Sequence, residues 1–143
     1  MNQYMKLKKR QQEEFNALPL GFAFNEEQFE KMMRNWELDS KADIDKICRI
    51  VGNGYIQKKD LKKLQELSNR HKAEREAAIA DDKTGDNFIY HMFLCELNNT
   101  EYGYTGDETD ALEVLDLTWE QLQADKRLLH GFEKASKRIL ENA

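Results

Sequence analysis

The sequence contains little that would crosslink the chain, interrupt its helices or anchor it in a membrane. It has one proline, Pro19, and seven glycines, which leaves room for long helices. Its two cysteines, Cys48 and Cys95, each lie in an apolar helical pattern and are expected to be reduced. The N-terminus is charged from Lys6 onward, unlike a signal peptide. No apolar run approaches the roughly 20 residues that span a bilayer. We therefore expect a cytoplasmic protein.

Catalytic signatures are also missing. The sequence contains no GxSxG, Walker A, GxGxxG or kinase motif, so an enzyme is not expected and no catalytic or cofactor-binding residue is assigned. His91 and Cys95 are four residues apart and share one face of a predicted helix, where two metal ligands could meet. No third ligand is near in sequence, so we interpret them as a structural pair and assign no metal site. A small metal-dependent enzyme using His91 stays open as an alternative.

The composition indicates a folded, helical protein. Hydrophobic residues make up 40% of the chain and charged residues 34%, and a disordered chain would have fewer apolar residues. A length of 143 residues fits one domain. The spacing of apolar residues predicts an all-α fold: a compact single domain over residues 1–143 with six to seven helices. Residues 1–17 are expected to form a peripheral N-terminal helix.

Helix signals in the first half are local. Asn25 and Gln28 resemble a capping pair, with Phe24 and Phe29 as a hydrophobic staple. A short helix is predicted after Ser40, and its expected buried face is formed by Ile44, Ile47, Cys48 and Val51. Residues 52–54 end it in a left-handed Asn-Gly turn, Tyr55 and Ile56 are briefly extended, and a long helix runs over residues 58–80. Its second half is polar and solvated.

The second half carries the most apolar segment. Asp86 is predicted to cap a helix over residues 88–97 at the centre of the core. Residues 98–106 form a loop, and a helix over residues 111–115 follows. Thr118 and Gln121 form a second capping box, and the last helix spans residues 128–140. Gly131 inside that helix costs about 1 kcal/mol relative to alanine, which indicates close packing or a local break.

Charge is distributed unevenly along the chain. Residues 1–76 carry a net charge of +3 and residues 77–143 a net charge of −8. Residues 81–125 contain 12 acidic residues and one lysine. Such a segment repels nucleic acid and suits a basic protein surface, although a solvated acidic face that only maintains solubility stays open. The candidate partner-binding residues are Tyr102, Tyr104, Asp107, Glu108, Asp110, Glu113 and Asp116.

Three segments carry a family resemblance: residues 18–29, the turn at residues 53–56 and the segment 103–107. Over about residues 15–135 the chain resembles uncharacterised small acidic helical proteins of phages and mobile elements of Gram-positive gut bacteria. The resemblance implies no activity and no catalytic residues. It implies a setting in which small acidic proteins, such as anti-CRISPR and anti-restriction proteins, block host defences.

The leading hypothesis is therefore an inhibitor that binds a basic surface on a protein partner, such as a nucleic-acid-binding defence enzyme. It would use neither nucleic acid nor a membrane as its own ligand. A second hypothesis is a structural or regulatory helical module without an inhibitory role, whose partner binds the exposed helix around residues 68–80. The sequence leaves the oligomeric state open.

Overall fold

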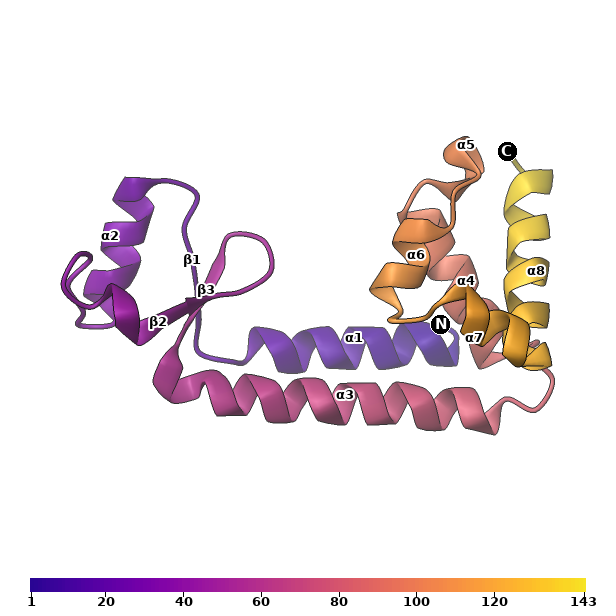
Figure 1. Ribbon diagram of the computed structural model, residues 1–143, viewed down its shortest axis with the longest axis horizontal. Helices are drawn as coiled ribbons and strands as arrows, with labels where there is room; N and C mark the ends of the chain where they lie inside the picture. Colours follow the sequence, from indigo (N-terminus) through magenta and orange to yellow (C-terminus); the bar gives the residue numbers. More distant parts are fainter. The chain divides into compact units, whose positions relative to one another are not determined.

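The computed structural model describes residues 1–143, and their contacts divide into two compact units. Unit 1 comprises residues 1–10 and 73–143, and unit 2 comprises residues 11–72. Two helices, α1 (Gln3–Asn16) and α3 (Leu61–Asp81), contribute residues to both units (Figure 1). None of the helices combines the length and hydrophobicity that a bilayer crossing requires. The single-domain expectation stays a prediction.

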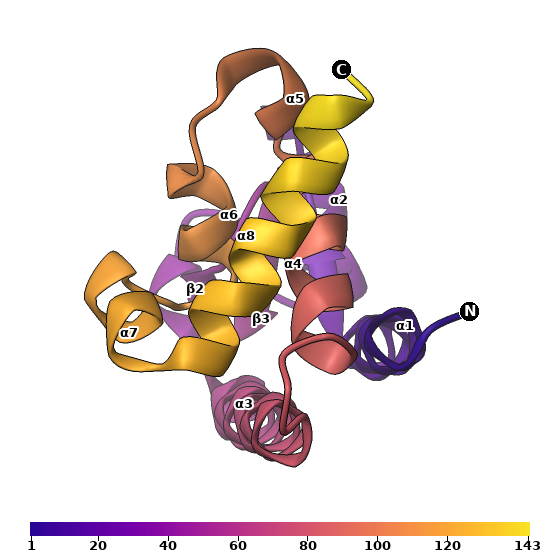
Figure 2. The same ribbon diagram turned by 90° about the vertical axis from the view of Figure 1, so that its right-hand side faces the viewer.

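Unit 1 is built around two crossing helices, α4 (Phe88–Asn99) and α8 (Lys126–Glu141) (Figure 2). Three shorter helices pack against this pair, namely α5 (Tyr102–Thr105), α6 (Thr109–Val114) and α7 (Trp119–Ala124). The segment predicted to lie at the centre of the core does so, since Phe93 is fully buried and meets Phe132 edge to face at 5.5 Å between ring centroids.

Gly131 allows α8 to lie directly on α4. A Cβ atom at Gly131 would stand 2.5 Å from Ile89 Cγ2 and 2.8 Å from the Gly85 carbonyl oxygen. No side chain fits at such distances, so close packing, the first of the two explanations considered from the sequence, accounts for this glycine.

The turn between α3 and α4 is organised by Asp82, which is only 5% exposed. Its carboxylate accepts backbone N–H groups of Gly85 at 2.9 Å and of Asn87 and Ile89 at 3.0 Å. Burial raises the pKa of Asp82, but these bonds outweigh it and hold that pKa below its usual value. The prediction that Asp86 caps α4 is wrong, because Asp82 binds the free amides at the start of the helix.

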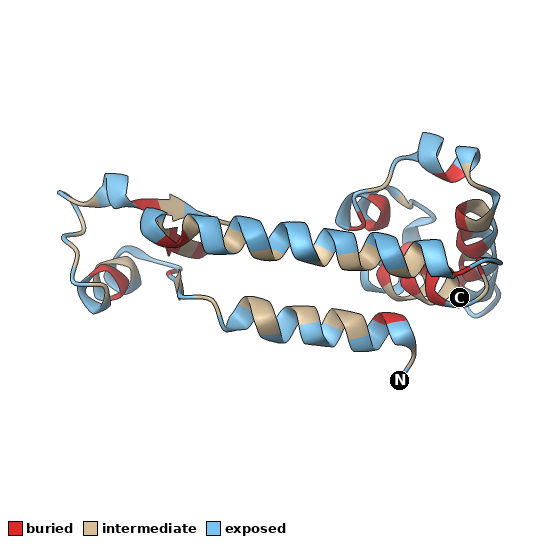
Figure 3. Ribbon diagram, turned by 90° about the horizontal axis from the view of Figure 1, so that it is seen from below, coloured by how far each residue is buried: buried red, intermediate tan, exposed pale blue.

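A buried carboxylate holds the N-terminal residues against α4. Glu96 is 2% exposed, accepts a hydrogen bond from the Tyr4 hydroxyl and pairs with Lys8 Nζ at 2.7 Å. Burial, followed by the hydrogen bond to Glu96 and then the charge of that carboxylate, raises the pKa of Tyr4. These contacts hold the first turns of α1 within unit 1. Tyr4 is the one residue of α1 that is buried, and no residue of α3 is buried (Figure 3).

Unit 2 contains a small antiparallel sheet with the strand order β1-β3-β2. The strands are β1 (Leu20–Phe22), β2 (Ile47–Arg49) and β3 (Gly54–Gln57). Helix α2 (Glu26–Asn35) packs on one face of the sheet, where a Cβ atom at Gly21 would lie 2.5 Å from the Met32 sulfur. Two 3₁₀ turns, Ile44–Lys46 and Lys58–Asp60, precede β2 and α3.

The sheet corrects the all-α prediction. The chain has eight α-helices rather than six to seven, and it has three strands. The helix predicted after Ser40 is wrong, since Ile47 lies in β2, Ile44 is 59% exposed and Val51 is 95% exposed. Residues 47–57 instead form a hairpin whose turn contains Gly52 at φ 73°. Pairing with the next strand, β3, decided between a helix and a strand, which short apolar runs fit equally well.

The two predicted capping pairs, at Asn25 and at Thr118, are present. The Asn25 side chain accepts the Gln28 N–H at 2.8 Å, while the Gln28 side chain accepts the N–H of Phe24. Thr118 and Gln121 form a full capping box at the start of α7. These signals lie within four residues of chain, which is why sequence alone found them.

Candidate interaction surface

The acidic segment of unit 1 forms a surface over α5, α6 and α7, which follow one another beside the α4–α8 pair (Figure 2). We call it the acidic surface. It comprises Tyr104, Asp107, Glu108, Asp110, Glu113, Val114, Asp116, Trp119 and Glu120. All of these residues are exposed except Glu108, which is half-buried.

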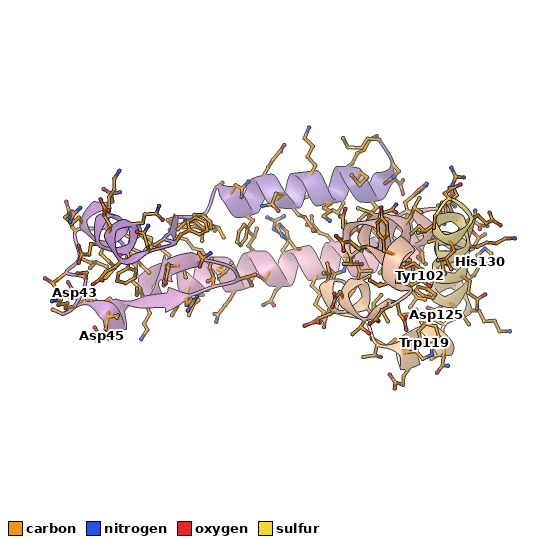
Figure 4. All side chains as sticks on the ribbon, turned by 90° about the horizontal axis from the view of Figure 1, so that it is seen from above. Asp43, Asp45, Tyr102, Trp119, Asp125 and His130 are labelled. Carbon is orange, nitrogen blue, oxygen red and sulfur yellow. The ribbon has the colours of Figure 1, made fainter.

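Of the two candidate tyrosines, one is buried and the other is exposed. Tyr102 is 7% exposed, and its hydroxyl and the Ser136 hydroxyl share a 2.8 Å hydrogen bond. Its ring lies in the core, 6.4 Å from the ring of Phe132, so Tyr102 is not part of the acidic surface (Figure 4). Tyr104 is 93% exposed. The two side chains leave a single turn of helix in different directions, which the sequence pattern did not distinguish.

Asp107 accepts hydrogen bonds within its own segment of the chain. Its Oδ1 accepts the Thr109 hydroxyl at 2.6 Å and the Thr109 backbone N–H at 2.9 Å, just before α6 begins. The side-chain bond first, and then the backbone bond, lower the pKa of Asp107. Asp107 therefore stays charged to lower pH than a free aspartate and stabilises the start of α6.

Three further carboxylates near α6 are uncompensated. The side chains of Glu108, Asp110 and Glu113 make no hydrogen bond and no ion pair. Asp110 and Glu113 are three residues apart on the helix, where like charges cost a few tenths of a kcal/mol. Asp116 follows the helix in a left-handed conformation at φ 55°. Glu108, Asp110 and Glu113 thus carry negative charge that the fold does not use for its own ion pairs.

Two exposed apolar side chains belong to the same segment of the chain. Val114 is 57% exposed and Trp119 is 39% exposed, and Trp119 rests edge to face on Phe132 at 5.4 Å (Figure 4). Sequence reasoning missed both residues. The sequence placed Val114 only within a predicted helix over residues 111–115, three residues after Ala111, which is buried. The spacing of apolar residues alone did not indicate that Val114 lies outside the buried face of α6.

The residues considered for metal chemistry do not converge. Neither His91 nor Cys95 belongs to a group of three side chains placed to hold a metal ion. Burial raises the pKa of the Cys95 thiol, and Asn99 donates a weak bond to its sulfur at 3.6 Å. The ring of His91 packs against Tyr90 with centroids 5.1 Å apart. The interpretation of His91 and Cys95 as a structural pair stays a prediction.

The ion pair of His130 was not anticipated from the sequence. His130 Nε2 lies 2.7 Å from Asp86 Oδ1, and Lys134 Nζ lies 3.2 Å from the same oxygen. The hydrogen bond to His130, followed by that to Lys134, lowers the pKa of Asp86. All three side chains are at least 44% exposed, so the group is an ordinary surface cluster.

Comparison with known proteins yields one match. A protein-family model described as "Family of unknown function (DUF7659)" matches residues 3–138, which is most of the chain. No curated protein and no solved structure matches the chain significantly.

Proposed function

We propose that this chain, which belongs to the family of unknown function DUF7659, is a protein-interaction module whose acidic surface binds a basic surface on a protein partner. It acts by binding and performs no catalysis of its own.

One observation carries the proposal: the segment that holds unpaired carboxylates also holds exposed apolar side chains. Glu108, Asp110 and Glu113 have no ion-pair partner, and Val114 and Trp119 are exposed in the same segment. Solubility alone accounts for exposed acids but not for an exposed valine and tryptophan in that segment. Interfaces place aromatic side chains at the centre and charge at the rim, where the charge steers association and suppresses wrong partners.

The resemblance to proteins of mobile elements suggests a consequence of such binding. A surface rich in carboxylates presents charge of the same sign as a phosphate backbone. Bound to the basic groove of a nucleic-acid-binding defence enzyme, it would exclude the nucleic acid and inhibit the enzyme. An inhibitor of the anti-CRISPR or anti-restriction type is therefore the specific form of this proposal.

The test compares two charge-reversed variants of the full chain. The first, Asp110→Lys with Glu113→Lys, reverses charge on the acidic surface. The control, Glu13→Lys with Glu133→Lys, makes the same change of charge at exposed sites on α1 and α8. Each protein is immobilised and used to capture proteins from a host-cell extract at low and at high salt, and the retained proteins are identified by mass spectrometry.

The proposal predicts at least one protein that the unmodified chain and the control retain and the acidic-surface variant loses. Retention should fall steeply with salt, because screening weakens steering by exposed charges. Retention that is equal for all three proteins and insensitive to salt would contradict it. That result would favour the second hypothesis, a helical module bound through its exposed helix.

A further inference from the structure

Strand β1 has an open hydrogen-bonding edge. It lies at the edge of the sheet, where Gly21 pairs with Tyr55 of β3. The Ala23 N–H donates to the Asn53 carbonyl oxygen at 3.0 Å in the same register. Hydrogen-bonded and non-hydrogen-bonded pairs alternate along an antiparallel ladder. Leu20 and Phe22 therefore turn their backbone groups away from β3.

Most of these outward groups have no partner. The N–H of Leu20 is used locally, since it donates to the Leu18 carbonyl oxygen at 2.8 Å. The N–H of Phe22 and the carbonyl groups of Leu20 and Phe22 stay free. An added strand needs a donor and acceptors on one edge, and three residues of β1 supply one donor and two acceptors.

A groove runs beside this edge. It has a volume of about 290 Å³ and is bounded by β1 and by one face of α2. The α2 side is lined by Gln28, Lys31, Met32, Asn35 and Trp36. Gly21 has no side chain, which lets Met32 and Trp36 approach the strand closely at the groove. Phe22 and Phe24, 55% and 73% exposed, extend apolar surface from the end of the strand.

The charge of the groove is defined by a single group. Lys31 is the one ionisable side chain in the lining, and it has no ion-pair partner. Although the chain has a net charge of −5, the local positive charge of Lys31 favours a carboxylate on the ligand at this point of the groove.

We propose that an extended segment of a partner protein adds to β1 as a fourth strand, with apolar side chains on the groove and an Asp or Glu side chain beside Lys31. The carbonyls of Leu20 and Phe22 accept from this segment, and the Phe22 N–H donates to it. Main-chain bonds of this kind give affinity, and pockets for alternate side chains give specificity. The site lies in unit 2, apart in sequence from the acidic surface.

The probe is a displayed library of random decapeptides, selected on the full-length chain. Phe22→Pro removes the free N–H without breaking a bond to β3, and proline is tolerated at the outer side of an edge strand. Phe22→Ala is its matched control, because it loses the ring and keeps the N–H. Lys31→Glu reverses the charge of the groove, with Lys41→Glu as the control on an exposed lysine elsewhere in unit 2.

Selected peptides should alternate apolar residues and carry one Asp or Glu. They should bind Phe22→Pro roughly tenfold or more weaker than Phe22→Ala, since one hydrogen bond of the main chain is lost. Lys31→Glu should weaken them and Lys41→Glu should not. If circular dichroism shows that Phe22→Pro does not fold, the comparison of Lys31→Glu with Lys41→Glu tests the proposal instead. Three results would overturn the proposal: no enriched peptide, equal binding by the two members of each pair, or a dimeric free chain with its Phe22 amide already protected from exchange.

Discussion

Replacing Asp82 with alanine should destabilise the protein more than any other single loss of a carboxylate in the turn before α4. The carboxylate is 5% exposed and holds the amides of Gly85, Asn87 and Ile89. Gly85 and Ile89 are buried, so their amides lose their acceptor without gaining water. An unsatisfied buried donor costs about 1–3 kcal/mol and a lost N-cap about 0.5–2 kcal/mol.

These contributions overlap, so we expect Asp82→Ala to lower the free energy of unfolding by about 3 kcal/mol. The matched control is Asp86→Ala, four residues away. Asp86 pairs with His130 and Lys134 at the surface, where an ion pair contributes at most about 1 kcal/mol. Urea unfolding followed by circular dichroism measures both variants.

The same variant predicts a pH dependence. Because the pKa of Asp82 in the folded protein lies below its unfolded value, its stabilisation is fully present above the unfolded pKa of about 3.9. It is lost as the pH falls through the lower folded pKa. The deficit of Asp82→Ala should therefore be constant from neutral pH to about pH 5 and shrink below about pH 4. A loss no larger than that of Asp86→Ala at neutral pH would refute the role assigned to Asp82.

Three further outcomes are expected from equilibrium unfolding or thermal melts. Gly131→Ala gains about 1 kcal/mol of helix propensity but forces a Cβ atom into Ile89 and the Gly85 carbonyl, which costs about 1–3 kcal/mol or more. We therefore expect a lower free energy of unfolding. A more stable variant would refute the close packing of α8 on α4. Tyr4→Phe should cost about 1–3 kcal/mol, because Glu96 loses a buried hydrogen bond, and an unchanged melt would contradict this contact. Asp110→Lys with Glu113→Lys should leave the melting temperature unchanged or slightly higher, and a collapse would show that these carboxylates are structural.

Local signals of the fold were predictable from sequence, and pairings between distant residues were not. Asn25 and Thr118 cap helices as predicted, because both partners of a cap lie within one turn. The strands at residues 20–22 and 47–49 each need a partner that their own sequence does not specify. Ile47 fits the apolar spacing of a short helix as well as it fits a strand, and only the register with Gln57 separates the two.

The candidate surface was predictable to a similar extent. Charge density singled out residues 107–116, and exposure of Asp110 and Glu113 follows from the cost of burying a charge. Tyr102 could not be separated from Tyr104, because a residue in a short turn reaches the core or the solvent according to how the turn docks. The exposure of Trp119 depends on how α7 packs against α8, which no local pattern contains.

The most direct test of the central claim is the rate of association between this chain and a partner captured by its acidic surface, measured at low and at high salt. The account predicts fast association at low salt that slows markedly as screening increases. It also predicts that Asp110→Lys with Glu113→Lys slows association at low salt, with a much smaller effect on dissociation. An association rate that neither salt nor this charge reversal changes would contradict the claim that the acidic surface is what the partner binds.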